Sequence, residues 1–195
     1  QNFYMSSNIL LVKNMVCGRC LLAVEDVLKS AAIPFQQVIT GEIHLEEKLT
    51  EKQHETLSEK LTAIGLELID SRMSGTIEKI KQLVIKKARN EENEKDSKTK
   101  LSAYLSQLLH HEYTYLSSFF SSVEGRTIEN YFIEQRIEKV KELLVYNEMT
   151  LSPIAFDMEY SSVAHLSNQF KKITGLTPSY FKQVGSSKRK LLDKI

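Results

Sequence analysis

The first 75 residues combine short β-like runs with apolar positions at helical spacing. Residues 8–13 form an apolar run that is typical of a buried strand, and residues 21–28 then repeat apolar side chains at helical spacing. Two β-rich stretches follow, Phe35–Ile39 and Glu42–Leu45, with a turn-capable Thr-Gly pair between them. The pattern therefore predicts a strand, a helix and a β-hairpin in this order.

A second helix and a last strand complete this part of the chain. Thr50 and Gln53 have the spacing of a capping box, in which the two residues bond each other's backbone at the start of a helix. The apolar face of this helix is formed by Leu57, Leu61 and Ile64. Gly65 suits the helix end, and residues 66–69 have the character of a short strand. The order βαββαβ predicts an α+β domain of the ferredoxin-like kind.

Beyond Ser74-Gly75 only helical periodicity remains. An amphipathic stretch at 76–90 predicts a linker helix, and it runs into a charged stretch at 90–100 without a core-forming pattern. The remaining apolar positions predict further helices and no strand. We therefore expect two domains, an α+β domain over 1–75 and an all-α domain over 76–195.

The all-α part contains an internal repeat with an offset of 50 positions. The repeated residues are Leu116, Ser117, Phe120, Gly125 and Thr127, which recur as Leu166, Ser167, Phe170, Gly175 and Thr177. Each copy predicts a helix that ends at glycine, with a threonine capping the next helix. The repeat alone is equally consistent with two helical hairpins that pack for stability.

A helix-turn-helix pattern within the second copy favours DNA binding. Residues 152–162 have the character of the first helix and the turn, with Ser152 as the N-cap and the small Ala155 where two helices cross closely. Val163–Thr174 is then the recognition helix, which in this motif enters the major groove.

A longer set of residues resembles the signature of the AraC/XylS family of bacterial regulators. These residues are Ile154-Ala155, Tyr160-Ser161-Ser162, His165-Leu166-Ser167, Phe170-Lys171-Lys172, Gly175, Thr177-Pro178 and Tyr180. Glu159 departs from the glycine that is common in the turn of that family. The resemblance covers roughly 76–183. It implies helix-turn-helix units at about 101–126 and 151–183, a joining helix at about Ile128–Tyr146, and recognition helices in successive major grooves about 34 Å apart.

The resemblance implies double-stranded DNA as the partner, with RNA polymerase as a further candidate. The candidate base contacts are Thr114, Ser117 and Ser118 in the first recognition helix, and Val163, Ala164, His165 and Asn168 in the second. The candidate phosphate contacts are Lys171, Lys172 and Lys182. Because several of the base-contacting side chains are small and none is arginine, we expect DNA shape to contribute strongly to recognition.

Charge supports this division of the chain. The net charge of +1 is the sum of −3 over residues 1–75 and +4 over residues 76–195. Residues 160–195 hold seven basic side chains and a single acidic one, Asp193. The cluster Lys188-Arg189-Lys190 adds to this positive end. We find no apolar run long enough to span a membrane and no leader-like segment, so we expect a soluble cytoplasmic protein. No catalytic motif is recognisable, and we expect no enzymatic activity.

The only cysteines form one pair, Cys17-Gly18-Arg19-Cys20. Two thiols so close together make a poor disulfide framework for a chain of 195 residues, which favours a metal or redox role. The segment from Met15 to Cys20 resembles the MxCxxC loop of heavy-metal-associated domains, the copper-chaperone fold, and the resemblance covers about residues 8–72. It implies that Cys17 and Cys20 are metal ligands and that Met15 lies near them. We expect Met15 itself to be a core residue.

Cu(I) is the first choice of metal, because it accepts two soft sulfur ligands, whereas structural Zn(II) wants four. Zn(II), no metal at all, another thiophilic ion such as Hg(II), a thiol switch and a relic site all stay open. The sequence thus predicts a soft-metal-responsive transcriptional regulator, with the linker helix near 76–90 coupling the domains. The alternative is a metal-trafficking or thiol-redox protein whose helical part is a docking module.

Overall fold

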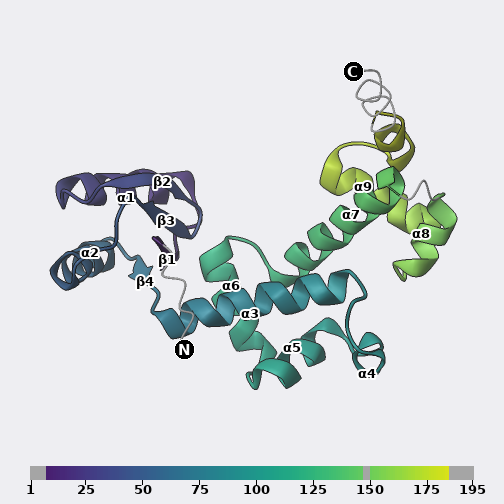
Figure 1. Ribbon diagram of the computed structural model, residues 1–195, viewed down its shortest axis with the longest axis horizontal. Helices are drawn as coiled ribbons and strands as arrows, with labels where there is room; N and C mark the ends of the chain where they lie inside the picture. The colour runs from purple at the N-terminus through teal and green to yellow at the C-terminus, as the bar shows by residue number, and fades with distance from the viewer. Residues whose placement is uncertain (1–7, 147–149, 185–195) are drawn as a thin grey trace. The chain divides into compact units, whose positions relative to one another are not determined.

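The computed structural model describes residues 8–146 and 150–184 (Figure 1). The basic cluster Lys188-Arg189-Lys190 lies outside the described residues. The chain divides into two compact units. Unit 1 contains the chain up to Lys81 together with Ser102–Ile128, and unit 2 contains Gln82–Leu101 together with the chain from Glu129 onward.

Unit 1 begins with a small antiparallel sheet and two helices. In chain order these elements are β1 (Ile9–Lys13), α1 (Gly18–Ser30), β2 (Phe35–Ile39), β3 (Glu42–Leu45), α2 (Glu51–Ala63) and β4 (Glu67–Leu68). The strand order in space is β2-β3-β1-β4. Strand β1 pairs antiparallel with both β3 and β4, and β2 pairs antiparallel with β3. The predicted α+β character of this part is confirmed.

The core of this sheet region is formed where both helices meet the strands. Helix α1 buries Val24 and Leu28, and α2 buries Leu57 and Leu61, all at helical spacing. Met15 is fully buried in the same cluster, as expected for a core residue. Each such side chain contributes about 1.5–3 kcal/mol by leaving water.

The ends of helix α2 are set by local chemistry. The capping box is present, because the Gln53 N–H donates to Thr50 Oγ1 and the Thr50 N–H donates to Gln53 Oε1. Gly65 has a φ of 80°, which suits the predicted helix stop. Ile64 does not belong to the buried face: it is the C-cap and is 45% exposed, because the backbone has already left the helix there.

Helix α3 (Ser71–Ala88) starts before the predicted linker helix and runs through Gly75. Its start is fixed by the Asp70 carboxylate, which accepts a hydrogen bond from the Met73 N–H. The charged stretch after α3 also holds more structure than its polarity predicts. It contains the short α4 (Glu94–Ser97), and the ammonium of the buried Lys87 donates to Glu92 at 2.8 Å and to the Asp96 and Ser97 carbonyls.

The remaining elements are helical in the described residues. They are α5 (Leu101–Leu109), α6 (Tyr113–Glu124), α7 (Ile128–Tyr146), α8 (Leu151–Asp157) and α9 (Val163–Thr174). The predicted joining helix and second recognition helix match α7 and α9. The N-cap of α8 is Thr150, not Ser152, so that prediction is wrong by one half-turn. None of the described helices is apolar enough over a sufficient length to cross a bilayer.

The internal repeat is visible in the backbone as well as in the sequence. Leu116 and Leu166 are fully buried in α6 and α9. Both helices end at a glycine in the left-handed conformation, Gly125 with φ 67° and Gly175 with φ 75°. The Thr177 hydroxyl oxygen accepts a hydrogen bond from the Tyr180 N–H, as expected for the cap of a following helix.

Candidate nucleic-acid interface and thiol pair

Helices α8 and α9 of unit 2 form a helix-turn-helix whose inner side is a compact apolar cluster. Ile154 and Ala155 of α8 pack with Leu166 and Phe170 of α9, and α7 closes the cluster with Ile137, Val140 and Leu144. Ala155 is 4% exposed, in accord with the small residue expected where helices cross closely. This packing fixes the orientation of α9 within unit 2.

The turn between α8 and α9 is held by Arg136 of α7. The Arg136 guanidinium donates to the Met158 carbonyl and lies over the Tyr160 ring, 4.2 Å from its centroid. Burial raises the pKa of Tyr160 although Arg136 opposes this shift, so the hydroxyl stays protonated and donates to Gln169 Oε1 at 2.7 Å. Arg136 was not singled out by its sequence position, because its partners lie more than 20 residues away.

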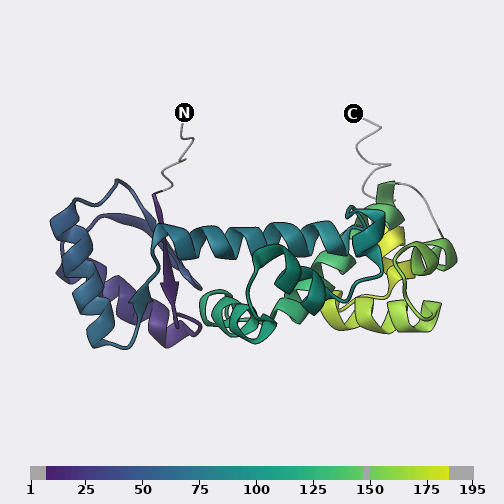
Figure 2. The ribbon, with the colours of Figure 1, turned by 90° about the horizontal axis from the view of Figure 1, so that it is seen from below.

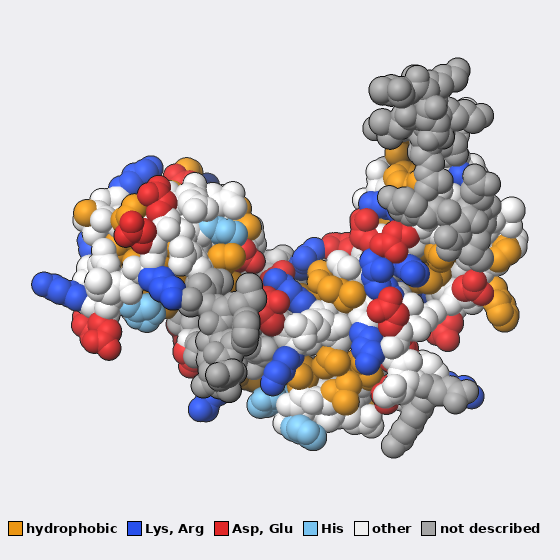
Figure 3. All heavy atoms as spheres, in the orientation of Figure 1, with side chains coloured by type: hydrophobic (Ala, Val, Ile, Leu, Met, Phe, Trp, Pro, Cys, Tyr) orange, Lys and Arg blue, Asp and Glu red, His pale blue; other side chains and the backbone are white. Residues whose placement is uncertain are grey.

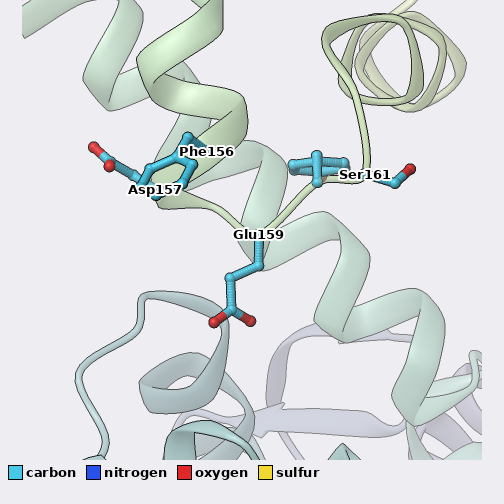
Figure 4. A pocket seen from close by; sticks show the side chains of 5 residues that line it. Phe156, Asp157, Glu159 and Ser161 are labelled. Carbon is cyan, nitrogen blue, oxygen red and sulfur yellow. The ribbon is translucent and has the colours of Figure 1, made fainter.

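Glu159 occupies the point of the turn where the AraC/XylS family, which the sequence resembles, commonly has glycine. Its φ is 54°, so it adopts the left-handed conformation at a cost of about 1–2 kcal/mol for a residue with a side chain. Figure 4 shows the Glu159 side chain pointing away from those of Phe156, Asp157 and Ser161, and all four residues line a hollow beside the turn. Because Glu159 is exposed, the departure from glycine puts no side chain into the packed core.

The outer side of α9 carries the predicted DNA contacts. Val163, Ala164, His165 and Asn168 are exposed, and the exposed Lys171 and Lys172 follow one turn later on the same stripe. Lys182 is half-buried. The start of the helix is well ordered by polar contacts, since the Ser162 hydroxyl accepts from the His165 N–H and the Ser161 hydroxyl lies 3.0 Å from His165 Nδ1. These base and phosphate contacts stay predictions.

Helix α6 presents a corresponding but different surface in unit 1. Thr114 and Ser118 are exposed and Ser117 is half-buried. Tyr115 was missed by the sequence reasoning, although it stands at the position of His165 in the repeat. It is 49% exposed and stacks on Phe119 at 6.0 Å between ring centroids. The 50-residue offset is the signal that identifies it.

Positive charge is unevenly divided between the two helices. No lysine or arginine occurs between Tyr113 and Gly125, whereas α9 carries Lys171 and Lys172 in its last turn. Figure 3 shows lysine and arginine side chains intermixed with acidic ones on the face that it presents. The salt-sensitive share of DNA affinity is therefore expected to come mainly from α9.

The thiol pair lies at the start of helix α1 in unit 1. Cys17 is the N-cap and is exposed, Cys20 is half-buried in the first turn, and both are free thiols with their Sγ atoms 2.8 Å apart. The pKa of Cys17 is lowered, first by the hydrogen bond from the Cys20 side chain and then by the Cys20 and Arg19 backbone N–H groups. The arrangement thus favours a nucleophilic, soft thiolate at Cys17.

The donor set fits a soft ion with two ligands. Within residues 8–146 and 150–184, no cluster of three or more His, Cys, Asp or Glu side chains is placed to hold a metal. His44 instead lies 2.8 Å from Glu42. The two Sγ atoms are 2.8 Å apart, which is too close for both to bind one ion. Each thiolate–metal bond is itself about 2.3 Å long, and the ion has to lie between the two sulfurs. The side chains therefore have to turn apart to bind an ion together.

Comparison with known proteins supports the helix-turn-helix assignment. Residues 105–183 match the helix-turn-helix domain family. The chain is 26% identical over 86 residues to the uncharacterized HTH-type transcriptional regulator YobQ of Bacillus subtilis (strain 168), covering 44% of this chain and 36% of that protein. It is 34% identical over 74 residues to the uncharacterized HTH-type transcriptional regulator in the cgkA 5' region of Pseudoalteromonas carrageenovora, covering 38% of this chain and 43% of that protein.

Two solved structures resemble part of the chain. The C-terminal domain of AraT, a response regulator from Geobacillus stearothermophilus, is 24% identical with a TM-score of 0.49, covering 58% of this chain and 88% of that one. The C-terminal domain of the two-component response regulator yesN from Fusobacterium nucleatum is 28% identical with a TM-score of 0.46, covering 54% of this chain and 95% of that one. The chain spans less than half the length of the two relatives described above.

Proposed function

We propose that this chain is a sequence-specific DNA-binding transcriptional regulator of the AraC type, which presents α6 and α9 to the major groove. The observation that carries the proposal is the repeated helix-turn-helix, with a buried inner side and an exposed stripe from Val163 to Lys172 on α9. The match of residues 105–183 to the helix-turn-helix domain family supports it. Two related proteins with the name of transcriptional regulator agree with this reading. RNA polymerase as a further partner and a cytoplasmic location belong to the same proposal.

The proposal is tested by selection from random duplex DNA with the full chain, followed by titration of the enriched sequence at several salt concentrations. We expect the enriched sequence to bind at least about 10³-fold more tightly than unrelated DNA at physiological salt. The logarithm of the binding constant should fall linearly with the logarithm of salt concentration, because phosphate contacts release counterions. Absence of any sequence enrichment at low and high salt would overturn the regulator proposal.

We further propose that the sheet region is a ferredoxin-like domain of the heavy-metal-associated kind, and that Cys17 and Cys20 bind a soft metal ion. The strand order β2-β3-β1-β4 and the packing of α1 and α2 in one core with the sheet support the fold assignment. The adjacent, accessible thiols with a lowered Cys17 pKa support soft-metal binding. A bound Cu(I) would supply a positive charge and a covalent bridge between the loop and the first turn of α1. The residues themselves provide the thiolates and the backbone N–H groups that stabilise them.

The metal proposal is tested with Cu(I) competed against a chromophoric chelator. The wild-type chain is expected to bind one equivalent, whereas Cys17→Ser/Cys20→Ser is expected to lose at least about 100-fold in affinity, because two thiolates are replaced by poor ligands for a soft ion. Zn(II) should bind more weakly, since two ligands leave its coordination incomplete. Unchanged Cu(I) and Zn(II) affinity in the double variant would dismiss the metal site.

A thiol-redox function is the second candidate, and the 2.8 Å separation of the two free thiols favours it. In that case the protein is a thiol-switched regulator or a redox protein that uses its helical part for docking. The two experiments separate these readings. DNA selection decides whether the helical part binds DNA, and the Cu(I) titration decides whether the thiols act as ligands.

A further inference from the structure

The loop between β1 and α1, residues 14–17, ends at Cys17 and is called the thiol loop below. It lies against the end of the first recognition helix, α6, inside unit 1. Figures 1 and 2 both show strand β1 beside α6, and the two elements are in contact. The loop between β1 and α1 donates one hydrogen bond to α6, from the Asn14 N–H to the Ser122 carbonyl at 2.6 Å. Ser122 lies in the last turn of α6, where carbonyls have no partner within the helix. The loop therefore supplies a partner that the helix lacks.

The β2-β3 turn approaches the same helix end even more closely. A Cβ added at Gly41 would come well inside 3.0 Å of the Val123 carbonyl oxygen, a separation that real Cβ atoms essentially never show. Gly41 is tied in turn to the thiol loop, because its N–H donates to the Met15 carbonyl at 3.1 Å. Only a glycine at this position allows the turn to lie on α6.

The glycine that ends α6 is packed, whereas its counterpart in the second unit is open. A Cβ at Gly125 would lie 3.1 Å from Thr40 Cγ2 and 3.5 Å from Val16 Cβ. A Cβ at Gly175 would meet nothing within 4 Å among the described residues. Val16 directly precedes Cys17. The first recognition helix thus ends against the residue next to the thiol pair, and the second does not.

Metal binding acts on this loop through Cys17, the residue at which the loop meets α1. Cys20 is fixed on α1, which is anchored in the core by Val24 and Leu28. Cys17 lies at the junction of the helix and the loop, with extended backbone angles and an exposed side chain. The two Sγ atoms must separate from 2.8 Å to hold one ion, and we expect Cys17 and the adjoining Val16 to take up this change because Cys20 is held on α1.

We propose that the Cys17–Cys20 site regulates the first helix-turn-helix unit directly, through the contact of residues 14–16 and 40–41 with the C-terminal end of α6. This inference rests on the proposed metal-binding function and names its target within the DNA-binding module. It adds a second coupling route to the predicted one through the linker helix near 76–90. Lys81 of α3 supports the same end of α6, because its ammonium bonds Glu124 at 2.6 Å. The helix end is therefore held by both α3 and the thiol loop, and only the loop carries the metal site.

The test is amide hydrogen exchange by NMR on the full chain, with and without one equivalent of Cu(I). We expect Cu(I) to accelerate exchange of the Asn14 and Gly125 amides at least about fivefold, the lower end of typical couplings between sites. The Gly175 amide, which donates to Lys171 at 2.9 Å in the equivalent place of unit 2, should change by less than about twofold. Cu(I) binding without acceleration at Gly125 would overturn the inference while leaving the metal site intact. Absence of Cu(I) binding would overturn both.

A matched pair of glycine variants tests the contact itself. Gly41→Ala is expected to lift the turn from α6, so that the Asn14 and Gly125 amides exchange fast before metal is added and Cu(I) changes them less than about twofold. Gly65→Ala has the same left-handed backbone strain, at φ 80° against 75°, but meets nothing within 4 Å, and should keep the wild-type response.

If Gly41→Ala does not fold, the milder Gly125→Ala takes its place with Gly175→Ala as control, since both are left-handed helix ends and only the first touches the thiol loop. Gly125→Ala should reduce the Cu(I) response of Asn14 at least about threefold relative to Gly175→Ala. Equal Cu(I) responses in a glycine variant and its control would contradict the proposed route.

Discussion

Lys171→Ala/Lys172→Ala is expected to weaken DNA binding about 60-fold at 0.1 M salt and to lower the salt slope by about 1.8. This follows because each phosphate contact contributes about 0.9 to the slope, which corresponds to about eightfold in affinity at that salt concentration. Both lysines are exposed on the stripe that follows His165 and Asn168. Sequence discrimination should hardly change, since phosphate contacts carry no base information.

The control for this double variant is Lys98→Ala/Lys100→Ala, which removes the same charge from exposed positions before α5. Its salt slope should stay within about 0.5 of the wild type if the effect belongs to α9 rather than to net charge. Both slopes are measured by fluorescence anisotropy on the selected duplex. Equal losses in the two double variants would show that α9 has no special contact with phosphate.

Phe170→Ala is expected to lower the free energy of unfolding of the second helix-turn-helix by about 3–5 kcal/mol. Phe170 is fully buried, packs edge-on against Phe181 with 5.5 Å between ring centroids, and belongs to the cluster shared by α7, α8 and α9. Its removal leaves a cavity that the surrounding helices cannot fill completely. DNA affinity should fall with it, because α9 loses its fixed orientation.

Ile173→Ala is the matched control on the same helix, since Ile173 is 40% exposed and should cost less than about 1 kcal/mol. Urea unfolding followed by circular dichroism measures both variants. Because the chain has two compact units, it can show two unfolding transitions. The transition whose midpoint shifts to lower urea in Phe170→Ala is assigned to unit 2. A cost below about 1.5 kcal/mol for Phe170→Ala would mean that the cluster does not hold α9 in place.

The sequence was sufficient wherever a local rule determines structure. The recognition helix Val163–Thr174 begins at a serine cap and ends at a left-handed glycine, and both signals are visible in the sequence. The capping box at Thr50 and the two hairpin strands follow from equally local patterns. Helix ends with weaker signals were predicted less accurately. For α8 the sequence indicated Ser152 as the N-cap, whereas the structure has Thr150.

The missed features depend on polar contacts, near and far along the chain, that hydrophobic periodicity does not report. Periodicity shows that α3 is amphipathic, but it does not show that Asp70 extends it backward or that Lys87 finds Glu92 and two carbonyls. The contact between Asn14 and Ser122 joins residues more than 100 positions apart. The sequence predicted the thiol pair and the DNA contacts as two separate sites. The structure places the thiol loop and the first recognition helix in the same unit.

The difference between Gly125 and Gly175 separates the roles of the two DNA half-sites. One recognition helix ends on the thiol loop, and the other ends in open space among the described residues. Under the proposed regulation, a promoter that relies on the half-site of α9 would be occupied in both signal states. A promoter that relies on the half-site of α6 would be occupied in only one of them. The order and strength of half-sites in a promoter would then decide whether a gene senses the metal at all.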